Sequence, residues 1–274
     1  MNDNSRDKQT HNYGILMMEK LWFYDYKNKY NGNEPPFFDS STIPEAKSIE
    51  ENYHPIHQEL KELWEKNSNE TENAYLKDLD IFDDKQFPAH SWKKIIFHFG
   101  GIKNKEAYKR FPITASLVDS PNIICCFVSK TLANSIIRPH CGEYNAYWRI
   151  HLGLSVPSSD KSICGIIVEN QCGGWQNGKA LAFLDAYEHH AYNRAQSDRY
   201  LLLIDVIRPE YSSRKNFIIV RAVVTKIYFF LCKKLKVRRP ERIYSRVLDG
   251  MSYLLFFPLQ FLIWLNNRVT FIKF

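Results

Sequence analysis

Seven short, β-rich segments follow one another between residues 93 and 206, and they limit what this chain can fold into more than any other feature of its sequence. The segments read KKIIFHF, NIICCFVS, SIIRPH, YWRIHLGLSV, CGIIVE, KALAFLDAY and RYLLLIDV. Turn signals such as GG, CGEYN, PSSD and CGGWQNG separate them, and Asn177-Gly178 is a typical hairpin turn. Many short strands without helical patterns between them predict a sandwich or barrel. A double-sheet jelly roll fits best.

The sequence on either side of these segments has a different character. Residues 1–12 are polar and are expected to be disordered, and they do not read as a signal peptide. Residues 13–88 place apolar side chains near helical spacing, with an interruption at Pro55. We therefore expect a mainly β protein, with a jelly-roll domain over 89–210 between a helical N-terminal region and a helical C-terminal tail over 211–274.

Charge is unevenly distributed along the chain, whose net charge is +7. Residues 208–248 carry 12 Lys/Arg and 2 Asp/Glu, a local +10, whereas the 207 residues before them carry 23 Lys/Arg and 27 Asp/Glu, a local −4. A mildly acidic body with a strongly basic tail indicates an anionic partner.

Two apolar runs in the tail suggest what that partner is. Residues 217–231 and 251–265 are 15 residues each, shorter than the roughly 20 that a membrane-spanning helix needs. With the cationic stretch KKLKVRRPER between them, they predict helices on an anionic membrane surface, contacted through residues 212–274. The alternative is that both runs pack against the sheet. Nucleic acid is the least favoured partner, because the tail has no base-reading motif.

The cysteines point to a reducing compartment. No two of them have CxxC spacing, and adjacent cysteines are poor candidates for a disulfide bond. We therefore expect a cytoplasmic protein, peripheral on the inner face of a membrane. The cysteines are residues 125, 126, 141, 164, 172 and 232.

Period-two alternation locates chemistry inside the predicted barrel. In YWRIHLGL, Arg149 and His151 lie on one face of the strand, and Trp148, Ile150 and Leu152 lie on the other. Two polar groups on one face of an apolar strand must face a space that is wet, charged or filled by a ligand. In a jelly roll this space is the barrel interior.

Other polar residues stand near the same predicted opening. His140 ends the preceding strand, the sequence Glu188-His189-His190 follows KALAFLDAY, and Arg199 begins the last strand. None of them is specific alone, since a single buried histidine is more often a hydrogen-bonded structural residue than a metal ligand.

Taken together, these motifs resemble a known family. From Ser129 to Pro209 the chain resembles the aspartyl/asparaginyl β-hydroxylases, which are iron(II)- and 2-oxoglutarate-dependent dioxygenases and have the lipid A hydroxylases as relatives. The motifs RPHCG, RIHLGLSVP, GWQNGKALAFLDAYEHHAYN and DRYLLLIDVIRPE stand in the family's order and spacing. A weaker resemblance extends back to about Trp92. The resemblance as a whole implies a cupin-like, double-stranded β-helix, iron(II) as the bound metal, and 2-oxoglutarate and O2 as cosubstrates.

The resemblance also implies the metal ligands. His140 matches the first iron ligand and His189, 49 residues further on, matches the second, so both are the expected catalytic residues. His190 is the alternative to His189 because it is the adjacent residue.

The same resemblance implies a cosubstrate site. Arg199 matches the arginine that pairs with the far carboxylate of 2-oxoglutarate, which suits the planar, bidentate guanidinium. Ser129 matches a serine that contacts the same cosubstrate. Arg149 and His151 match the inward pair that lines its pocket.

Gly142 is the departure from the usual pattern. Non-haem iron oxygenases generally use two histidines and one carboxylate, and the carboxylate follows the first histidine by two residues. Glycine at this position resembles the protein hydroxylases, where water takes the vacant place, whereas lipid A hydroxylases generally have an acid. Glu143 and Glu188 are substitutes that the sequence leaves open. Asp185 matches a family acid that either bonds to a metal-binding histidine or caps a turn.

Gly142 thus favours one substrate class. The expected reaction is hydroxylation of an unactivated carbon, first the β-carbon of Asp or Asn in a peptide or protein. The alternatives are 2-hydroxylation of the acyl chain of a membrane lipid, or an inactive, membrane-tethered binding module.

Overall fold

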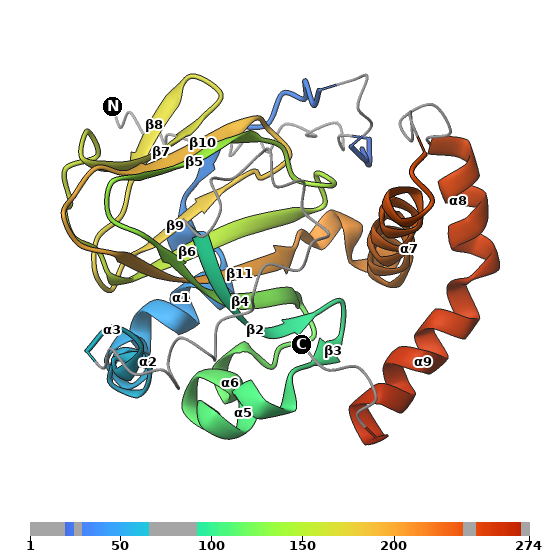
Figure 1. The fold of residues 1–274 in the computed structure, drawn as a ribbon, viewed down its shortest axis with the longest axis horizontal. Coiled ribbons are helices and arrows are strands. Elements are labelled where there is room, and N and C mark those ends of the chain that lie inside the picture. The colour runs from blue at the N-terminus through green and yellow to red at the C-terminus, as the bar shows by residue number, and fades with distance from the viewer. Residues whose placement is uncertain (1–19, 25–28, 66–91, 238–244, 270–274) are drawn as a thin grey trace, which may run out of the picture.

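Two antiparallel sheets face each other in the computed structural model, which describes residues 20–24, 29–65, 92–237 and 245–269 (Figure 1). The expected disorder of residues 1–12 lies outside these ranges. The seven-stranded sheet has the order β1 (Phe37–Phe38), β9 (Ala180–Phe183), β6 (Tyr147–Ser155), β11 (Arg199–Ile207), β4 (Ile123–Thr131), β2 (Trp92–Phe99) and β3 (Ile102–Lys103). The four-stranded sheet has the order β5 (Ser135–His140), β10 (His189–Asn193), β7 (Cys164–Val168) and β8 (Gln171–Gly174).

The connectivity of β4 to β11 is that of a double-stranded β-helix. The strands β9, β6, β11 and β4 are neighbours in one sheet, and β5, β10, β7 and β8 are neighbours in the other. All of these pairings are antiparallel. The chain therefore passes between the two sheets as a jelly roll requires, and the fold predicted from the sequence is confirmed.

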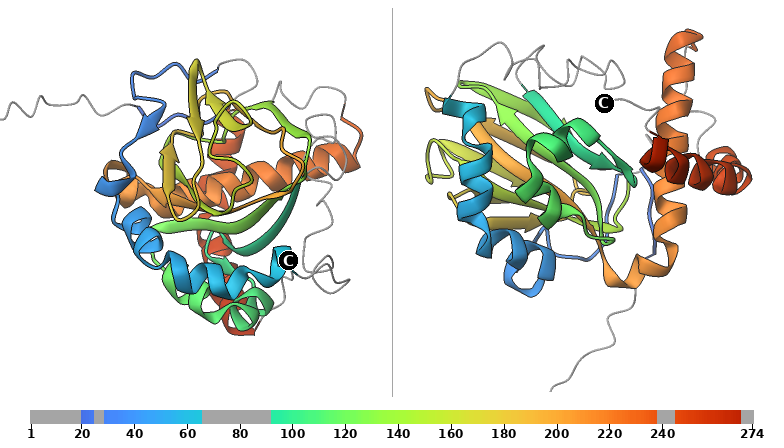
Figure 2. Two further views of the ribbon diagram at one scale, coloured as in Figure 1. Left: turned by 90° about the vertical axis from the view of Figure 1, so that its left-hand side faces the viewer. Right: turned by 90° about the horizontal axis from the view of Figure 1, so that it is seen from below.

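The seven-stranded sheet is buried on both faces. Along β11, Leu202 and Ile204 pack in one core cluster and Leu201 and Leu203 in another. The second cluster lies between the sheets, and the first lies under helices on the outer face (Figure 2). This double burial explains the unbroken apolar run in RYLLLIDV, since each fully buried leucine contributes about 1.5–3 kcal/mol. The covering helices are α1 (Pro44–Glu51), α2 (Tyr53–Leu60), α3 (Glu62–Glu65), α5 (Lys105–Arg110) and α6 (Pro112–Val118).

The N-terminal region is only partly helical. Helices α1 to α3 lie within the region expected to be helical, whereas residues 29–38 are non-helical and end in the short strand β1. Pro35 and Pro36 lack the N–H groups that a helix uses. This segment bonds to the barrel instead: β1 pairs with β9, and Leu184 N donates to Pro36 O at 3.0 Å.

The C-terminal tail begins with a 3-10 turn, Pro209–Arg214, and continues as α7 (Lys215–Lys234), α8 (Ser245–Leu254) and α9 (Phe256–Val269). Ile218, Ile219 and Ala222 of α7 pack against barrel residues that include Tyr144 and Tyr147. The first half of the apolar run 217–231 therefore packs against the protein, as the alternative to a membrane-surface helix expected, whereas Ile227 and Leu231 are exposed. Helices α8 and α9 lie on the far side of α7 (Figures 1 and 2).

Within the described ranges, no individual helix has both the length and the apolar character for a membrane crossing. Val247–Leu254 and Phe256–Val269 meet these criteria only as a pair, and the pair is bent by 57°.

Candidate active site

The end of β5 and the start of β10 bring His140 and His189 together. The two residues are partners in the β5–β10 register, and their ring centroids are 4.2 Å apart. Each Nδ1 lies beside a backbone carbonyl two residues earlier in the chain, at 2.8 Å from Arg138 O and 2.9 Å from Tyr187 O. A carbonyl only accepts hydrogen bonds, so each Nδ1 carries a proton and each Nε2 carries a lone pair. The two imidazoles are thus set up as neighbouring metal ligands through Nε2.

The electrostatics of the pair suit this role. Burial and the adjacent His189 lower the pKa of His140 to about 3. The imidazole is therefore neutral at physiological pH, as a metal ligand must be.

Asp185, in the connection between β9 and β10, adds a buried carboxylate beside His189. Its Oδ1 lies 3.1 Å from His189 Nε2 and accepts a hydrogen bond from Arg149 Nη1 at 2.6 Å, while Oδ2 accepts from the Tyr147 hydroxyl. Although burial opposes it, the charge of Arg149, together with the contacts to His189 and Tyr147, holds the pKa of Asp185 well below its usual range. A lone pair on Nε2 and a carboxylate oxygen are both acceptors, so this contact needs a cation, either a proton or a metal ion.

Gly142 is explained by Asp185. A Cβ on Gly142 would lie 2.0 Å from Asp185 Oδ2 and 2.9 Å from the Asp185 carbonyl oxygen, to which Gly142 N also donates at 2.7 Å. The carboxylate of Asp185 thus occupies the space that a side chain at position 142 would need. Sequence reasoning placed a vacancy here and gave Asp185 a minor role. The sequence feature that could have identified Asp185 is its position four residues before His189.

The described residues hold no preformed site of three or more His, Cys, Asp or Glu side chains. The histidine pair nevertheless fits an iron centre, because the two imidazole rings are neighbours and a carboxylate lies beside His189 Nε2.

Arg149 points into the barrel, as the alternation predicted, but its donors are engaged by acids. Nε and Nη2 form a bidentate pair with Asp205 at 2.7 and 2.8 Å, and Nη1 bonds to Asp185. Arg149 therefore holds Asp185 in place. Asp205, which sequence reasoning did not single out, lies opposite Arg149 in the β6–β11 register, so strand pairing alone brings the two together.

A second group of polar side chains surrounds Trp175. Arg199 lies with Cζ 4.1 Å from the Trp175 ring centroid, and its Nη2 donates to Thr131 Oγ1 at 2.8 Å. Trp175 Nε1 donates to His151 Nδ1 at 3.2 Å, so His151 carries its proton on Nε2. Ser129 lies two residues before Thr131 on β4, and its Oγ accepts from Trp92 Nε1 at 2.7 Å.

Three buried donors of this group have no hydrogen-bond partner among the described residues: Arg199 Nε, Arg199 Nη1 and His151 Nε2. Leaving a buried donor unmatched costs about 1–3 kcal/mol, and more when the donor is charged. Donors of this kind, one of them a guanidinium, fit a carboxylate ligand.

Two residues that the sequence left open are directed away from the histidine pair. His190 follows His189 on β10 and so lies on the opposite face of that strand. Glu188 is exposed and forms an ion pair with Lys29 at 2.6 Å.

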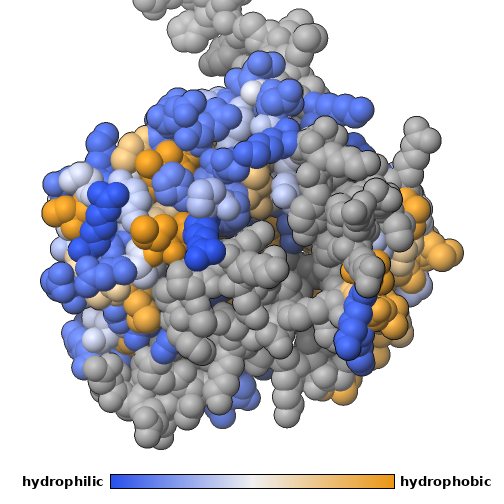
Figure 3. Space-filling model, turned by 45° about the horizontal axis from the view of Figure 1, so that its top comes forward, coloured by the Kyte–Doolittle hydropathy of each residue, from blue (hydrophilic) through white to orange (hydrophobic). Residues whose placement is uncertain are grey.

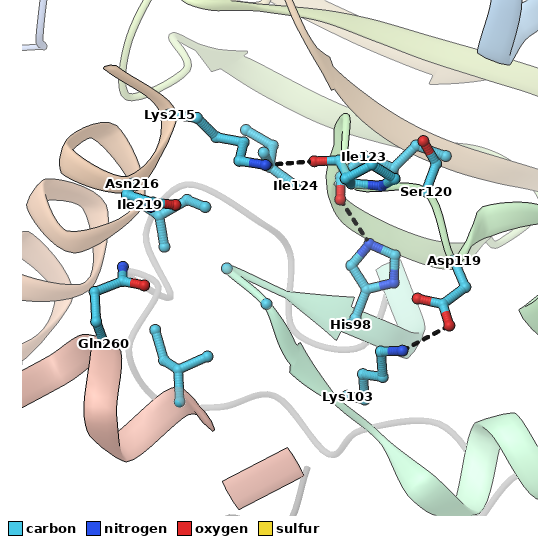
Figure 4. Close-up of a pocket in the computed structure, with 14 residues that line it drawn as sticks. His98, Lys103, Asp119, Ser120, Ile123, Ile124, Lys215, Asn216, Ile219 and Gln260 are labelled. Atoms are coloured by element: carbon cyan, nitrogen blue, oxygen red, sulfur yellow. Dashed lines mark hydrogen bonds and ion pairs between the residues drawn. The ribbon is translucent and has the colours of Figure 1, made fainter. Parts of the chain in front are cut away.

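A cavity of about 360 Å³ lies elsewhere, between the β2–β3 turn, α7 and α9 (Figure 4). Two of its lysines are engaged within the protein, since Lys103 Nζ donates to Asp119 at 2.6 Å and Lys215 Nζ donates to Pro121 O at 2.9 Å. None of the predicted site residues lines it. It is a gap between the barrel and the tail helices.

Comparison with known proteins gives the following matches. The family model described as aspartyl/asparaginyl beta-hydroxylase matches residues 50–209. The ornithine lipid ester-linked acyl 2-hydroxylase of Rhizobium tropici is 34% identical over 199 residues, which are 71% of this chain and 69% of that protein. The human aspartyl/asparaginyl beta-hydroxylase is 31% identical over 132 residues, 46% of this chain but only 17% of that protein. A Burkholderia pseudomallei oxidoreductase of the 2OG-Fe(II) oxygenase family has a TM-score of 0.31 at 11% identity, over 44% of this chain and 70% of that structure.

Proposed function

The chain belongs to the aspartyl/asparaginyl β-hydroxylase family, and on this premise we propose that it is an iron(II)- and 2-oxoglutarate-dependent dioxygenase that hydroxylates the acyl chain of a membrane lipid at C2. One observation supports the chemistry: the four-stranded sheet carries a pair of histidines whose Nδ1 atoms bond to backbone carbonyls, and the facing seven-stranded sheet carries buried donors of Arg199 and His151 that have no partner among the described residues.

His140 and His189 would hold the iron through Nε2, with Asp185 beside them. Iron(II), 2-oxoglutarate and O2 together supply the oxidising power for C–H hydroxylation, while the protein supplies geometry. Asp185 is fixed by Arg149 and Tyr147, so its charge stays directed at the histidine pair.

Arg199, His151 and Ser129 would bind the cosubstrate. The guanidinium of Arg199 lies on Trp175 and is tied to Thr131, which leaves Nε and Nη1 for a carboxylate. The preset orientation lowers the entropy lost on binding.

The substrate assignment departs from the one expected from Gly142. That expectation treated Gly142 as a vacancy typical of protein hydroxylases, but Asp185 occupies the adjoining space, so the glycine no longer separates the two classes. The ornithine lipid hydroxylase shares 34% identity over more than two thirds of both chains, whereas the match to the human protein spans 17% of that protein. These proportions favour an acyl chain over an Asp or Asn residue.

The test combines purified protein, iron(II), 2-oxoglutarate and lipids extracted from cells that lack the gene. We expect O2-dependent succinate formation and the gain of one oxygen atom on a lipid acyl chain, both abolished in His140→Ala. Oxygen found on Asp or Asn residues of peptides instead would reject the lipid substrate. Failure to bind either iron or 2-oxoglutarate would reject the enzyme and leave an inactive binding module.

Arg199 provides a separate prediction for the cosubstrate. Arg199→Met should weaken 2-oxoglutarate binding by about 100-fold or more, because it removes at least two charge-assisted hydrogen bonds, whereas Arg199→Lys should recover part of the loss. Anaerobic calorimetric titration measures this. Arg194→Met is the matched control, since Arg194 is exposed and donates to Ser162 O at 3.1 Å. Equal affinities for Arg199→Met and Arg194→Met would contradict the assignment.

A further inference from the structure

Helices α8 and α9 present an apolar stripe to solvent. Tyr253, Leu254 and Phe257 are 67%, 78% and 80% exposed, and Phe261 and Trp264 continue the line at helical spacing. The stripe crosses the junction of the two helices, and hydrophobic surface is visible at the right-hand edge of Figure 3, the side on which Figure 1 places them. Contiguous apolar surface of this kind marks an interaction site.

The opposite side of the same helices is packed against α7. Leu248 of α8 is buried with Val220 and Val224, and Leu255 and Leu259 pack against that cluster. Polar residues share the buried side, since Ser252 and Asn266 are both 0% exposed. Helices that bury an asparagine and expose phenylalanines reverse the pattern of a water-facing surface helix. The exposed stripe is therefore suited to an apolar environment.

The charge around the stripe indicates which environment this is. The stretch 208–248 has a net charge of +10, and Lys234 and Lys236, at the end of α7, are exposed. Arg268, also exposed, lies 4.3 Å from the ring of Trp264. Apolar and aromatic side chains flanked by cations match the interface of a bilayer that contains anionic lipids.

A series of ring contacts leads from the stripe to the active site. Tyr253 packs on Phe217 at 4.7 Å between centroids, Phe217 on Phe23 at 6.4 Å, and Phe23 on Tyr144 at 6.0 Å. Tyr144 is two residues after Gly142. The stripe is thus joined by packed side chains to the loop that follows His140.

We propose that Tyr253, Leu254, Phe257, Phe261 and Trp264 form a docking face that seats the protein on the surface of an anionic lipid bilayer. Helix α7 lies between this docking face and the barrel (Figure 1). That the docked lipids supply the acyl chain rests on the proposed function, whereas docking itself does not.

The experiment measures flotation of the full-length protein with vesicles, in the absence of iron and 2-oxoglutarate. The vesicles are phosphatidylcholine alone or phosphatidylcholine mixed with phosphatidylglycerol. We expect binding to the mixed vesicles that weakens as salt is added. The double variant Phe257→Ser/Phe261→Ser should bind about tenfold less or weaker still, because two apolar side chains no longer enter the interface.

The control variant is Ile113→Ser/Ile163→Ser, which removes two exposed apolar side chains outside α8 and α9 and should bind like the wild type. His140→Ala should also bind normally, so a failure of the catalytic proposal and a failure of docking give different results.

Three outcomes would overturn the docking face. The wild type could remain unbound with both kinds of vesicle, or the Phe257/Phe261 variant could bind as the wild type does. The third is a wild-type dimer that the Phe257/Phe261 substitutions dissociate without any change in vesicle binding, since the face would then be an interface between two copies of this chain.

Discussion

Asp185 shows how much a single residue contributes to this site. Its carboxylate contacts His189, Arg149 and Tyr147, and it also occupies the space beside Gly142. The absence of a side chain at position 142 and the presence of an acid at position 185 are therefore one feature. An acid brought from a loop 43 residues away takes the place next to the histidines where related enzymes generally use a neighbour in the sequence.

At the residue scale, Gly142→Ala tests this relation. The new Cβ meets two groups of Asp185: its carboxylate, which two partners hold in place, and its backbone oxygen. We therefore expect a loss of about 1–3 kcal/mol in the free energy of unfolding, together with weaker binding of iron(II). Chemical denaturation and a metal titration measure the two effects. Gly250→Ala is the matched control, because a Cβ there meets nothing within 4 Å and a helical alanine stabilises by up to about 1 kcal/mol. Unchanged stability and unchanged iron affinity in Gly142→Ala would refute the steric argument.

Helix α7 is the element that joins the catalytic barrel to the docking face. One side of it packs on Tyr144 and Tyr147, and Tyr147 donates to Asp185. Its other side packs on α8, and the buried Arg221 bonds to Asp249 of α8 at 2.7 Å. Arg221 is a charged residue within the apolar run 217–231, and its burial against Asp249 shows that this charge contributes to packing between helices.

At the element scale, Asp249→Asn should destabilise the protein by about 1–2 kcal/mol. The change leaves the buried guanidinium of Arg221 without a counter-ion, and the half-exposed position of Asp249 moderates the loss. Arg221→Met/Asp249→Asn should recover most of it, because the uncompensated charge is gone. Glu51→Gln is the control: it removes an exposed partner of Lys47 and should change stability by less than about 0.5 kcal/mol. Urea unfolding gives all three values, and a loss in Asp249→Asn no larger than in the control would disprove the ion-pair role.

Across the whole molecule, segments from both ends of the chain complete the barrel. The single O–H of Tyr187 is shared between the carbonyls of Gly32 and Glu34, and Arg208 Nη1 donates to the Glu34 carboxylate at 2.8 Å. Phe23 sits between Tyr144 and α7. The jelly-roll strands thus depend on contacts that lie outside the motifs by which the family is recognised.

At this scale, two truncations should have different consequences. Ending the chain after residue 244 removes α8 and α9, and we expect 2-oxoglutarate binding to persist while vesicle binding is lost. Ending it after residue 214 also removes α7 and exposes the apolar cluster around Tyr144 and Tyr147, so the melting temperature and 2-oxoglutarate affinity should both fall. Thermal unfolding and calorimetry measure these effects. Equal behaviour of the two truncations would contradict the separate roles of α7 and the docking face.

Local pattern and motif spacing determined a good part of this protein. Alternation placed Arg149 and His151 on one inward face, turn signals predicted the jelly roll, and the family motifs pointed to His140 and His189. The fold inference succeeds because strand period is a property of neighbouring residues, whereas the assignment of His140 and His189 as iron ligands stays a prediction. Local pattern does not predict which side chains meet across the barrel, because only strand register and loop path bring distant residues together.

Tertiary structure alone decided three matters. It placed Asp185 in the space beside Gly142, it paired Arg149 with Asp205, and it separated the two apolar runs of the tail into a packed first half of α7 and an exposed stripe on α8 and α9. Hydropathy cannot distinguish those two runs, since an apolar side chain loses its contact with water equally well in a protein core or in a lipid interface.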